Sequence, residues 1–103
     1  MIDLNSVRGH EQAGRRPCLV FSDDLYNAGP AEKHIVVPIT LKDKGIPYHV
    51  RISPPEGGLK MLSYLMCDDI RCVSRERFLA RSGVVSAQVI GMVGSCLQIL
   101  LGS

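Results

Sequence analysis

The stretch from Gly9 to Pro17, GHEQAGRRP, concentrates side chains that can do chemistry. It holds the imidazole of His10, a carboxylate, a primary amide and two adjacent guanidiniums, and it offers a core almost nothing to bury. A guanidinium forks onto pairs of anionic oxygens, and histidine is the side chain that titrates near neutral pH without perturbation. The stretch therefore favours anion binding combined with proton transfer.

Length and composition limit what surrounds this stretch. The chain has 103 residues, 46% of them hydrophobic, which is enough to bury a core without metal or disulfide staples and predicts one domain over residues 1–103. The same composition excludes a disordered chain. A net charge of +2 excludes a polybasic protein, so any anion site is local.

The cysteines Cys18, Cys67, Cys72 and Cys96 form no CxxC pair and none of the usual zinc spacings. They are expected to be free thiols in a reducing cytoplasm, and no metal site is expected. A glycine-rich phosphate loop of the Walker or Rossmann type is missing from the sequence. Nucleotide-dependent enzymes are therefore poor candidates, and no nucleotide cofactor is expected.

Short apolar runs bounded by turn residues predict a domain that is mainly β. The expected strands are residues 17–22, 34–40, 48–53, 62–67 and 70–74. Residues 23–34, 41–47 and 54–58 are expected to be loops or turns, and residues 75–83 a helical turn. Pro38 lacks an N–H group, which predicts an edge, a bulge or a strand end just before Thr40.

The uncharged segment from Ser82 to Ser103 is long enough to raise the alternative of a membrane anchor. Its polar and small residues nevertheless recur at steps of three and four, opposite a stripe of valine, isoleucine and leucine. This pattern predicts a helix with one buried side, with Ser86 as N-cap and Gly102 as the stop. The sum is a small antiparallel sheet, curled into a partial barrel and covered by the terminal helix.

Four blocks in this order resemble the MazF, PemK and Kid family of bacterial toxins: residues 9–22, VVPIT at 36–40, residues 57–78 and the Gly-Val-Val-Ser entry into the terminal helix. The resemblance implies an SH3-like partial barrel of the CcdB/MazF type and a homodimer. It implies metal-independent, sequence-specific cleavage of single-stranded RNA, with messenger RNA as the first candidate, leaving a 2′,3′-cyclic phosphate and a 5′-hydroxyl. It also implies a cognate antitoxin with an acidic disordered tail.

The resemblance assigns four catalytic candidates. Arg16 matches the family's catalytic arginine, and Thr40 matches a catalytic or phosphate-binding Thr or Ser. A guanidinium suits a transition state that gains charge on phosphoryl oxygens, but its pKa makes it a poor base. His10 is the natural proton carrier. Asp68 matches a carboxylate of the Kid-like branch, as a base or as the group that orients the His10 imidazole.

The chain departs from the family at two positions. The Kid-like branch has an arginine two residues before the aspartate, and Met66 stands there in this chain. Arg16 with Thr40 is therefore the first choice for catalysis. Family members also carry a fuller first strand ahead of the position of Asp3, so this strand is expected to be short or truncated.

Glu11 and Gln12 are expected to shape the loop and contact bases, with a purely structural role as the alternative. Arg15 and Arg71 are expected RNA contacts; Arg71 belongs to a cluster with three further arginines that follows an RNA backbone, binds an acidic antitoxin or forms a solvated face. His34 and His49 receive no role. Two other functions stay open, a non-catalytic toxin that binds a protein such as DNA gyrase and a degenerate member that only binds an antitoxin.

Overall fold

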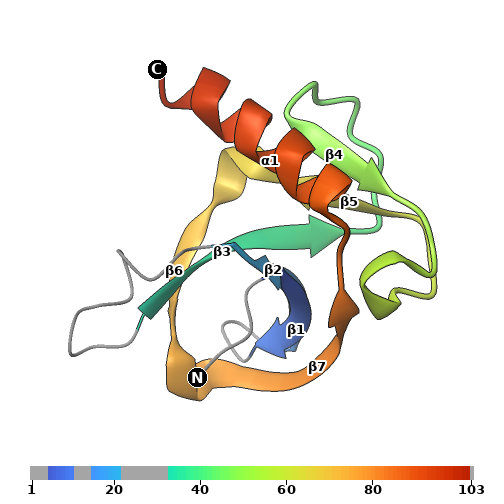
Figure 1. Cartoon of the computed structure of the whole chain (residues 1–103), viewed down its shortest axis with the longest axis vertical. Coiled ribbons are helices and arrows are strands. Elements are labelled where there is room, and N and C mark those ends of the chain that lie inside the picture. The colour runs from blue at the N-terminus through green and yellow to red at the C-terminus, as the bar shows by residue number, and fades with distance from the viewer. Residues whose placement is uncertain (1–4, 11–14, 22–32, 103) are drawn as a thin grey trace.

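The computed structural model describes residues 5–10, 15–21 and 33–102 of the chain (Figure 1). Its strands are β1 (Ser6–His10), β2 (Arg16–Val20), β3 (Lys33–Thr40), β4 (His49–Ile52), β5 (Ser63–Met66), β6 (Arg71–Ser74) and β7 (Phe78–Val84). The helix is α1 (Ala87–Leu100), and the short 3₁₀ turns are η2 (Glu56–Gly58), η3 (Cys67–Asp69) and η4 (Arg75–Arg77).

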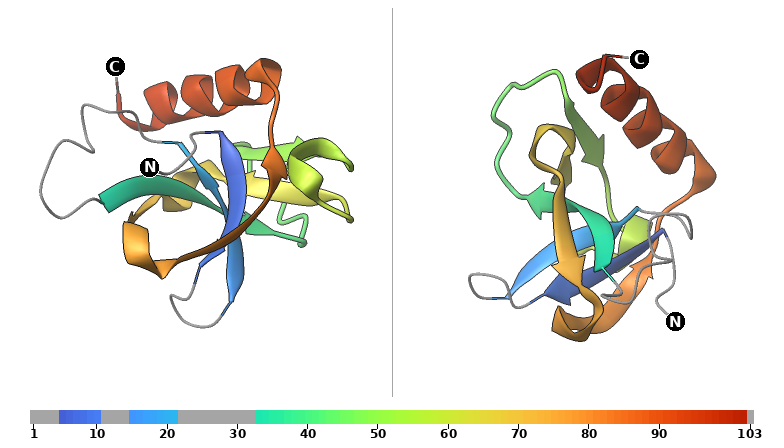
Figure 2. Two further views of the ribbon diagram at one scale, coloured as in Figure 1. Left: turned by 60° about the horizontal axis from the view of Figure 1, so that its bottom comes forward. Right: turned by 90° about the vertical axis from the view of Figure 1, so that its left-hand side faces the viewer.

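The strands form one antiparallel sheet in the order β4-β5-β3-β2-β1-β7, and β6 pairs with the first half of β3. The sheet curls on itself so that β6 and β7 run around β1 to β3, while α1 lies across one side (Figures 1 and 2). The predicted class, mainly β with a C-terminal helix over a partial barrel, is confirmed.

Pro38 sits inside β3, at the point where the strand changes partners. β6 pairs with residues 33–36 of β3, and β5 pairs with Ile39 and Thr40. The N–H of Phe21 donates to the carbonyl of Ile35 on the β2 side, 3.0 Å away. Because backbone polar groups alternate along a strand, the ring nitrogen of Pro38 faces the other side, where β6 has ended and β5 has not begun. The missing donor therefore costs no ladder bond.

Both faces of β2 and β3 are buried, which explains their continuous apolar runs. Leu19 and Val37 belong to a cluster on the face covered by α1. A second cluster inside the curl is made of Cys18, Val20, Val36, Val73 of β6 and the partly buried Phe78. The pair of strands β2 and β3 is thus packed on both faces. Polar side chains stand at the end of the pair where β2 begins and β3 ends.

The helix confirms the stripe that the sequence predicts. Val89, Val93 and Leu97 are buried at steps of four, and the Ser86 Oγ accepts a hydrogen bond from the Val89 N–H at 3.3 Å. Gly102 adopts a positive φ of 75° just after the helix, as a stop residue does. No helix within the described part of the chain is long and apolar enough to cross a membrane.

Gly9 and His10, which open the polar stretch, are the last residues of strand β1. One expectation about local structure was wrong. Of residues 75–83 only Arg75–Arg77 make a helical turn, and Phe78–Val84 form strand β7. β7 pairs with β1 alone, and most of its side chains are at least partly exposed, so it lacks the apolar alternation that identifies a strand.

Glycines allow η2 to touch β7 backbone to backbone. Gly58 has a φ of 72°, and a Cβ there would lie 2.1 Å from the Ser82 carbonyl oxygen. We expect Gly58→Ala to lower the free energy of unfolding by more than about 2 kcal/mol, because neither the φ nor the space suits a side chain. Gly91→Ala, on an exposed helix position with open space around it, should raise it by about 0.5–1 kcal/mol.

Urea unfolding followed by circular dichroism measures both values on matched Gly→Ala variants. Equal midpoints for Gly58→Ala and the wild type would contradict the close packing of η2 on β7.

Candidate active site

His10 and Arg16 face each other across the β1–β2 hairpin. The register pairs Val7 with Leu19 and ends with His10 opposite Arg16, at the end of the hairpin that residues 11–15 connect. Directly opposed side chains of an antiparallel pair lie on the same face, with Cβ atoms about 4.5–5.5 Å apart. The strand pairing thus brings together the two side chains that the sequence predicts as proton carrier and catalytic arginine.

Thr40 extends this row onto the next strand. The pairing of β2 with β3 ends at Cys18 opposite Pro38. Continuing the same register by two residues sets Arg16 of β2 level with Thr40 of β3. Since residues two apart share a face of a strand, Arg16 and Thr40 lie on the face of Cys18 and Pro38.

Arg71 joins the same face from β6. It pairs with Val36, whose side chain packs in the cluster inside the curl together with Cys18. Val73, two residues after Arg71, belongs to that cluster as well. His10, Arg16, Thr40 and Arg71 therefore lie on the same face of the sheet as the inner cluster, and we call these four residues the polar row.

His10 is the buried member of the polar row and is only 2% exposed. Its Nδ1 atom is buried and has no hydrogen-bond partner among the described residues. Burial lowers the pKa of His10 below its ordinary value of 6.5, and the positive charges of Arg71 and Arg16 lower it further. At neutral pH the imidazole is consequently uncharged and able to accept a proton.

The hydroxyl of Thr40 is oriented by the loop that follows it. Its Oγ1 accepts a hydrogen bond from the N–H of Lys42 at 3.2 Å. A hydroxyl that accepts a bond keeps its own hydrogen for donation. The half-buried Thr40 can thus donate to an anion, and the exposed Lys42 and Lys44 add positive charge to the same loop.

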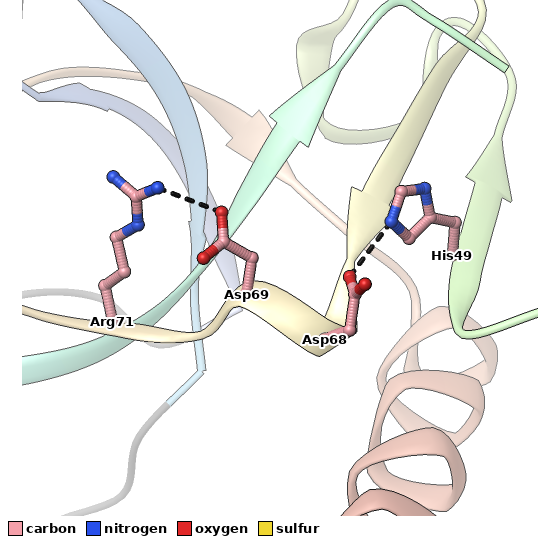
Figure 3. A network of polar contacts seen from close by, with 4 residues as sticks. All are labelled: His49, Asp68, Asp69 and Arg71. Carbon is pink, nitrogen blue, oxygen red and sulfur yellow. Dashed lines mark hydrogen bonds and ion pairs between the residues drawn. The ribbon is translucent and has the colours of Figure 1, made fainter. Parts of the chain in front are cut away.

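The two carboxylates of η3 turn to different partners (Figure 3). Asp69 Oδ2 lies 2.9 Å from an Nη2 of Arg71 and so holds an arginine of the polar row. Asp68 Oδ1 lies 3.0 Å from Nε2 of His49 on β4. This differs from the expectation that Asp68 orients the imidazole of His10; the charged groups that act on His10 are Arg71 and Arg16.

The remaining candidates have simpler positions. Arg15 is exposed directly before β2, whereas Glu11 and Gln12 lie outside the described residues. No group of three or more His, Cys, Asp or Glu side chains in residues 5–10, 15–21 and 33–102 could hold a metal ion. Sequence reasoning assigned no role to Asp69 or His49. For Asp69 a signal was present, because it stands two residues before Arg71, its ion-pair partner.

The family model described as "PemK-like, MazF-like toxin of type II toxin-antitoxin system" matches residues 1–101. The chain belongs to this family. The resemblance that the four sequence blocks carry is thereby confirmed over nearly the whole chain.

Curated relatives give the same result. The chain is 28% identical over 102 residues to the endoribonuclease toxin MazF of Escherichia coli K12, covering 98% of this chain and 87% of that protein. It is 31% identical over 105 residues to endoribonuclease MazF9 of Mycobacterium tuberculosis, covering 97% and 89%. The expectation of an enzyme of the endoribonuclease toxin class is confirmed at this level.

A solved structure of MazE-MazF from Deinococcus radiodurans shares the fold. The two superimpose with a TM-score of 0.81 and 27% identity, covering 98% of this chain and 95% of that one. That structure is of MazF together with MazE.

Proposed function

We propose that this toxin cleaves single-stranded RNA, with messenger RNA as the first candidate, by attack of the substrate's own 2′-hydroxyl on the adjacent phosphorus. The products are a 2′,3′-cyclic phosphate and a 5′-hydroxyl end. The single observation that carries the proposal is the polar row, in which two arginines, a threonine hydroxyl and an uncharged imidazole share one face of three neighbouring strands and β6.

Arg16 and Thr40 contact the scissile phosphate in this mechanism. Arg16 is exposed, and its guanidinium can fork onto two phosphoryl oxygens, a contact that strengthens as charge accumulates there in the transition state. Thr40 donates its hydroxyl hydrogen to a non-bridging oxygen. Because the nucleophile belongs to the RNA, the reaction requires no metal ion or cofactor.

His10 takes the proton of the 2′-hydroxyl. Burial and two neighbouring arginines lower its pKa, so the neutral form that a base requires prevails at pH 7. Nδ1 is fully buried, which leaves Nε2 as the atom that accepts the proton. The leaving 5′-oxygen takes its proton from water, because the guanidinium of Arg16 is too weak an acid to supply one efficiently.

The η3 carboxylates act through other residues. Asp69 orients Arg71, a member of the polar row, through an ion pair. The bond between Asp68 and His49 connects η3 to β4. We therefore assign Asp68 a positioning role in place of direct chemistry. Arg15 and Arg71 contact the RNA backbone, and Glu11 and Gln12 contact bases.

Two protein partners belong to the same proposal. The antitoxin presents an acidic disordered tail to the positive charges of Arg16, Arg71, Lys42 and Lys44, and the MazE-MazF complex of a relative supports this. A second copy of the chain forms a homodimer. The exposed apolar side chains at the end of α1, Ile99, Leu100 and Leu101, support an interface of this kind.

The test is to incubate the purified protein with a long RNA in EDTA and to map the ends of the fragments. We expect discrete cuts within single-stranded regions, 5′-hydroxyl ends that a polynucleotide kinase labels directly, and cyclic phosphates on the other side. An RNA with 2′-deoxy substitution at a mapped cut is the matched control and should stay intact there.

Intact RNA after incubation with folded protein would overturn the proposal and favour a non-catalytic toxin. Cleavage that requires added Mg²⁺ would contradict the metal-free mechanism.

A further inference from the structure

Two thiols outside the polar row lie side by side where η3 meets α1. Cys67 of η3 is 1% exposed and belongs to the core cluster under α1, and the half-buried Cys96 of α1 packs against that cluster. The Cys96 thiol is close enough to Cys67 to contribute to the raised pKa of that thiol. The other cysteines are elsewhere, with Cys18 in the inner cluster and Cys72 exposed on β6.

Cys96 is the member of the pair that solvent reaches. It lines an open groove of about 720 Å³ between β4 and α1, together with His49, Met92 and Ser95. Cys67 does not line this groove. A small reagent in the groove therefore meets Cys96 first and finds Cys67 directly behind it.

We propose that Cys67 and Cys96 are an oxidisable dithiol pair, which hydrogen peroxide converts into an intramolecular disulfide. Because both side chains pack in the same cluster, small shifts of η3 and α1 would bring them to the Cβ separation of about 3.5–4.5 Å that a disulfide requires. The pair joins two elements that are distant in sequence, a turn after β5 and the terminal helix.

The chemistry divides into two balanced steps. The Cys96 thiolate attacks one peroxide oxygen, the O–O bond breaks, and the second oxygen leaves as water after it takes a proton; the product is a sulfenic acid. The Cys67 sulfur then attacks the Cys96 sulfur, the S–O bond breaks, and the hydroxide leaves as water with the Cys67 proton. Two thiols lose two electrons in total, and one peroxide gains them.

Burial supports this order of events. Burial raises the pKa of the Cys67 thiol to about 12, and Cys96 contributes to the increase, so Cys67 stays protonated and is a poor first nucleophile toward peroxide. It reacts once a sulfenic acid has formed next to it. Cys67 is thus the resolving thiol and Cys96 the thiol that meets the oxidant.

The disulfide would tie η3 to α1 and thereby restrain Asp68 and Asp69, which follow Cys67 in the same turn. An effect on RNA cleavage rests on the proposed function, but formation of the bond does not. The experiment therefore reads out the bond itself.

The reduced full-length protein is treated with hydrogen peroxide, denatured, alkylated and mapped by mass spectrometry of unreduced peptides. The alkylatable thiols should fall from four to two per chain, with Cys67 and Cys96 in one cross-linked peptide, and dithiothreitol should restore four. The exposed-cysteine control Cys72→Ser should fall from three to one. Cys96→Ser should keep three.

A sulfinic acid on Cys96 with Cys67 still alkylatable would overturn the proposal, as would a disulfide through Cys72 or between chains as the main product. Peptide mapping of the wild type decides the matter even if Cys96→Ser does not fold. Urea unfolding gives a second readout, since the oxidised chain should unfold at a higher urea midpoint than the reduced one.

Discussion

Replacing Arg16 by alanine should lower the rate of RNA cleavage by about 10²- to 10³-fold, the usual loss when one donor to transition-state charge is removed. Arg16 is exposed at the first position of β2, so its side chain contributes little to the core. The loss should appear in kcat, because the contact with the phosphoryl oxygens is strongest in the transition state. The unfolding midpoint should stay close to that of the wild type.

Arg15→Ala is the matched control, because Arg15 is the neighbouring exposed arginine and lies just before the paired part of β2. It should raise KM and leave kcat within a few-fold of the wild type, as expected for a contact that binds substrate and transition state equally. Arg16→Lys should recover only part of the rate, since an ammonium cannot fork onto two oxygens. Equal kcat values for Arg15→Ala and Arg16→Ala would remove Arg16 from the mechanism.

The elements that sequence patterns predicted best are those buried by their own side chains. The β-branched run of β3 and the apolar stripe of α1 follow from residue types alone, because each buries a face that any tertiary arrangement has to cover. The cap at Ser86 is equally local, since it needs only the N–H of Val89 three residues later.

The strands β1 and β7 could not be found in this way. Their pairing depends on an open sheet edge and on the contact of Gly58 with Ser82, which join segments far apart in the chain. The position of His10 also depends on this pairing of distant segments. Its residue type indicated proton transfer, but only the pairing register reveals that it lies opposite Arg16 and almost fully buried.

The doublet Asp68-Asp69 marks the limit of site prediction from a motif. Adjacent side chains of a short turn point in different directions, and the resemblance alone selected Asp68. In the structure Asp68 contacts His49, and Asp69 contacts Arg71 of the polar row (Figure 3). Which of two neighbouring carboxylates reaches a site depends on turn geometry, and residue spacing does not encode it.

The largest effect on the pH profile should come from Arg71. Cleavage requires neutral His10, so the rate should fall at acidic pH with its half-maximum below the ordinary histidine pKa of 6.5. Burial is the main cause of the lowered pKa, and Arg71 is the first of its two charged causes. Arg71→Gln removes that positive charge, so the pKa of His10 should rise and the acidic half-maximum should move to higher pH, without passing 6.5 because burial remains.

The measurement is kcat/KM from pH 4.5 to 8 for the wild type and Arg71→Gln, with Arg77→Gln as the control, a range chosen to extend about two pH units below the ordinary histidine pKa. Arg77 is exposed on η4 and is not among the groups that act on His10, so its removal should leave the half-maximum in place. An unchanged half-maximum in Arg71→Gln, with normal folding, would show that the acidic limb reports a group other than His10.

Stability gives an independent check of the same pKa. His10 has a lower pKa in the folded chain than in the unfolded chain, so between the two values the unfolded chain binds more protons. The contribution of His10 to the free energy of unfolding should therefore be fully present above pH 6.5. It should decrease as the pH falls from 6.5 toward the pKa of His10 in the folded chain, and it should change no further below that pKa. Arg71→Gln should narrow that window from its acidic side, because a smaller difference between the two pKa values leaves less stability to lose.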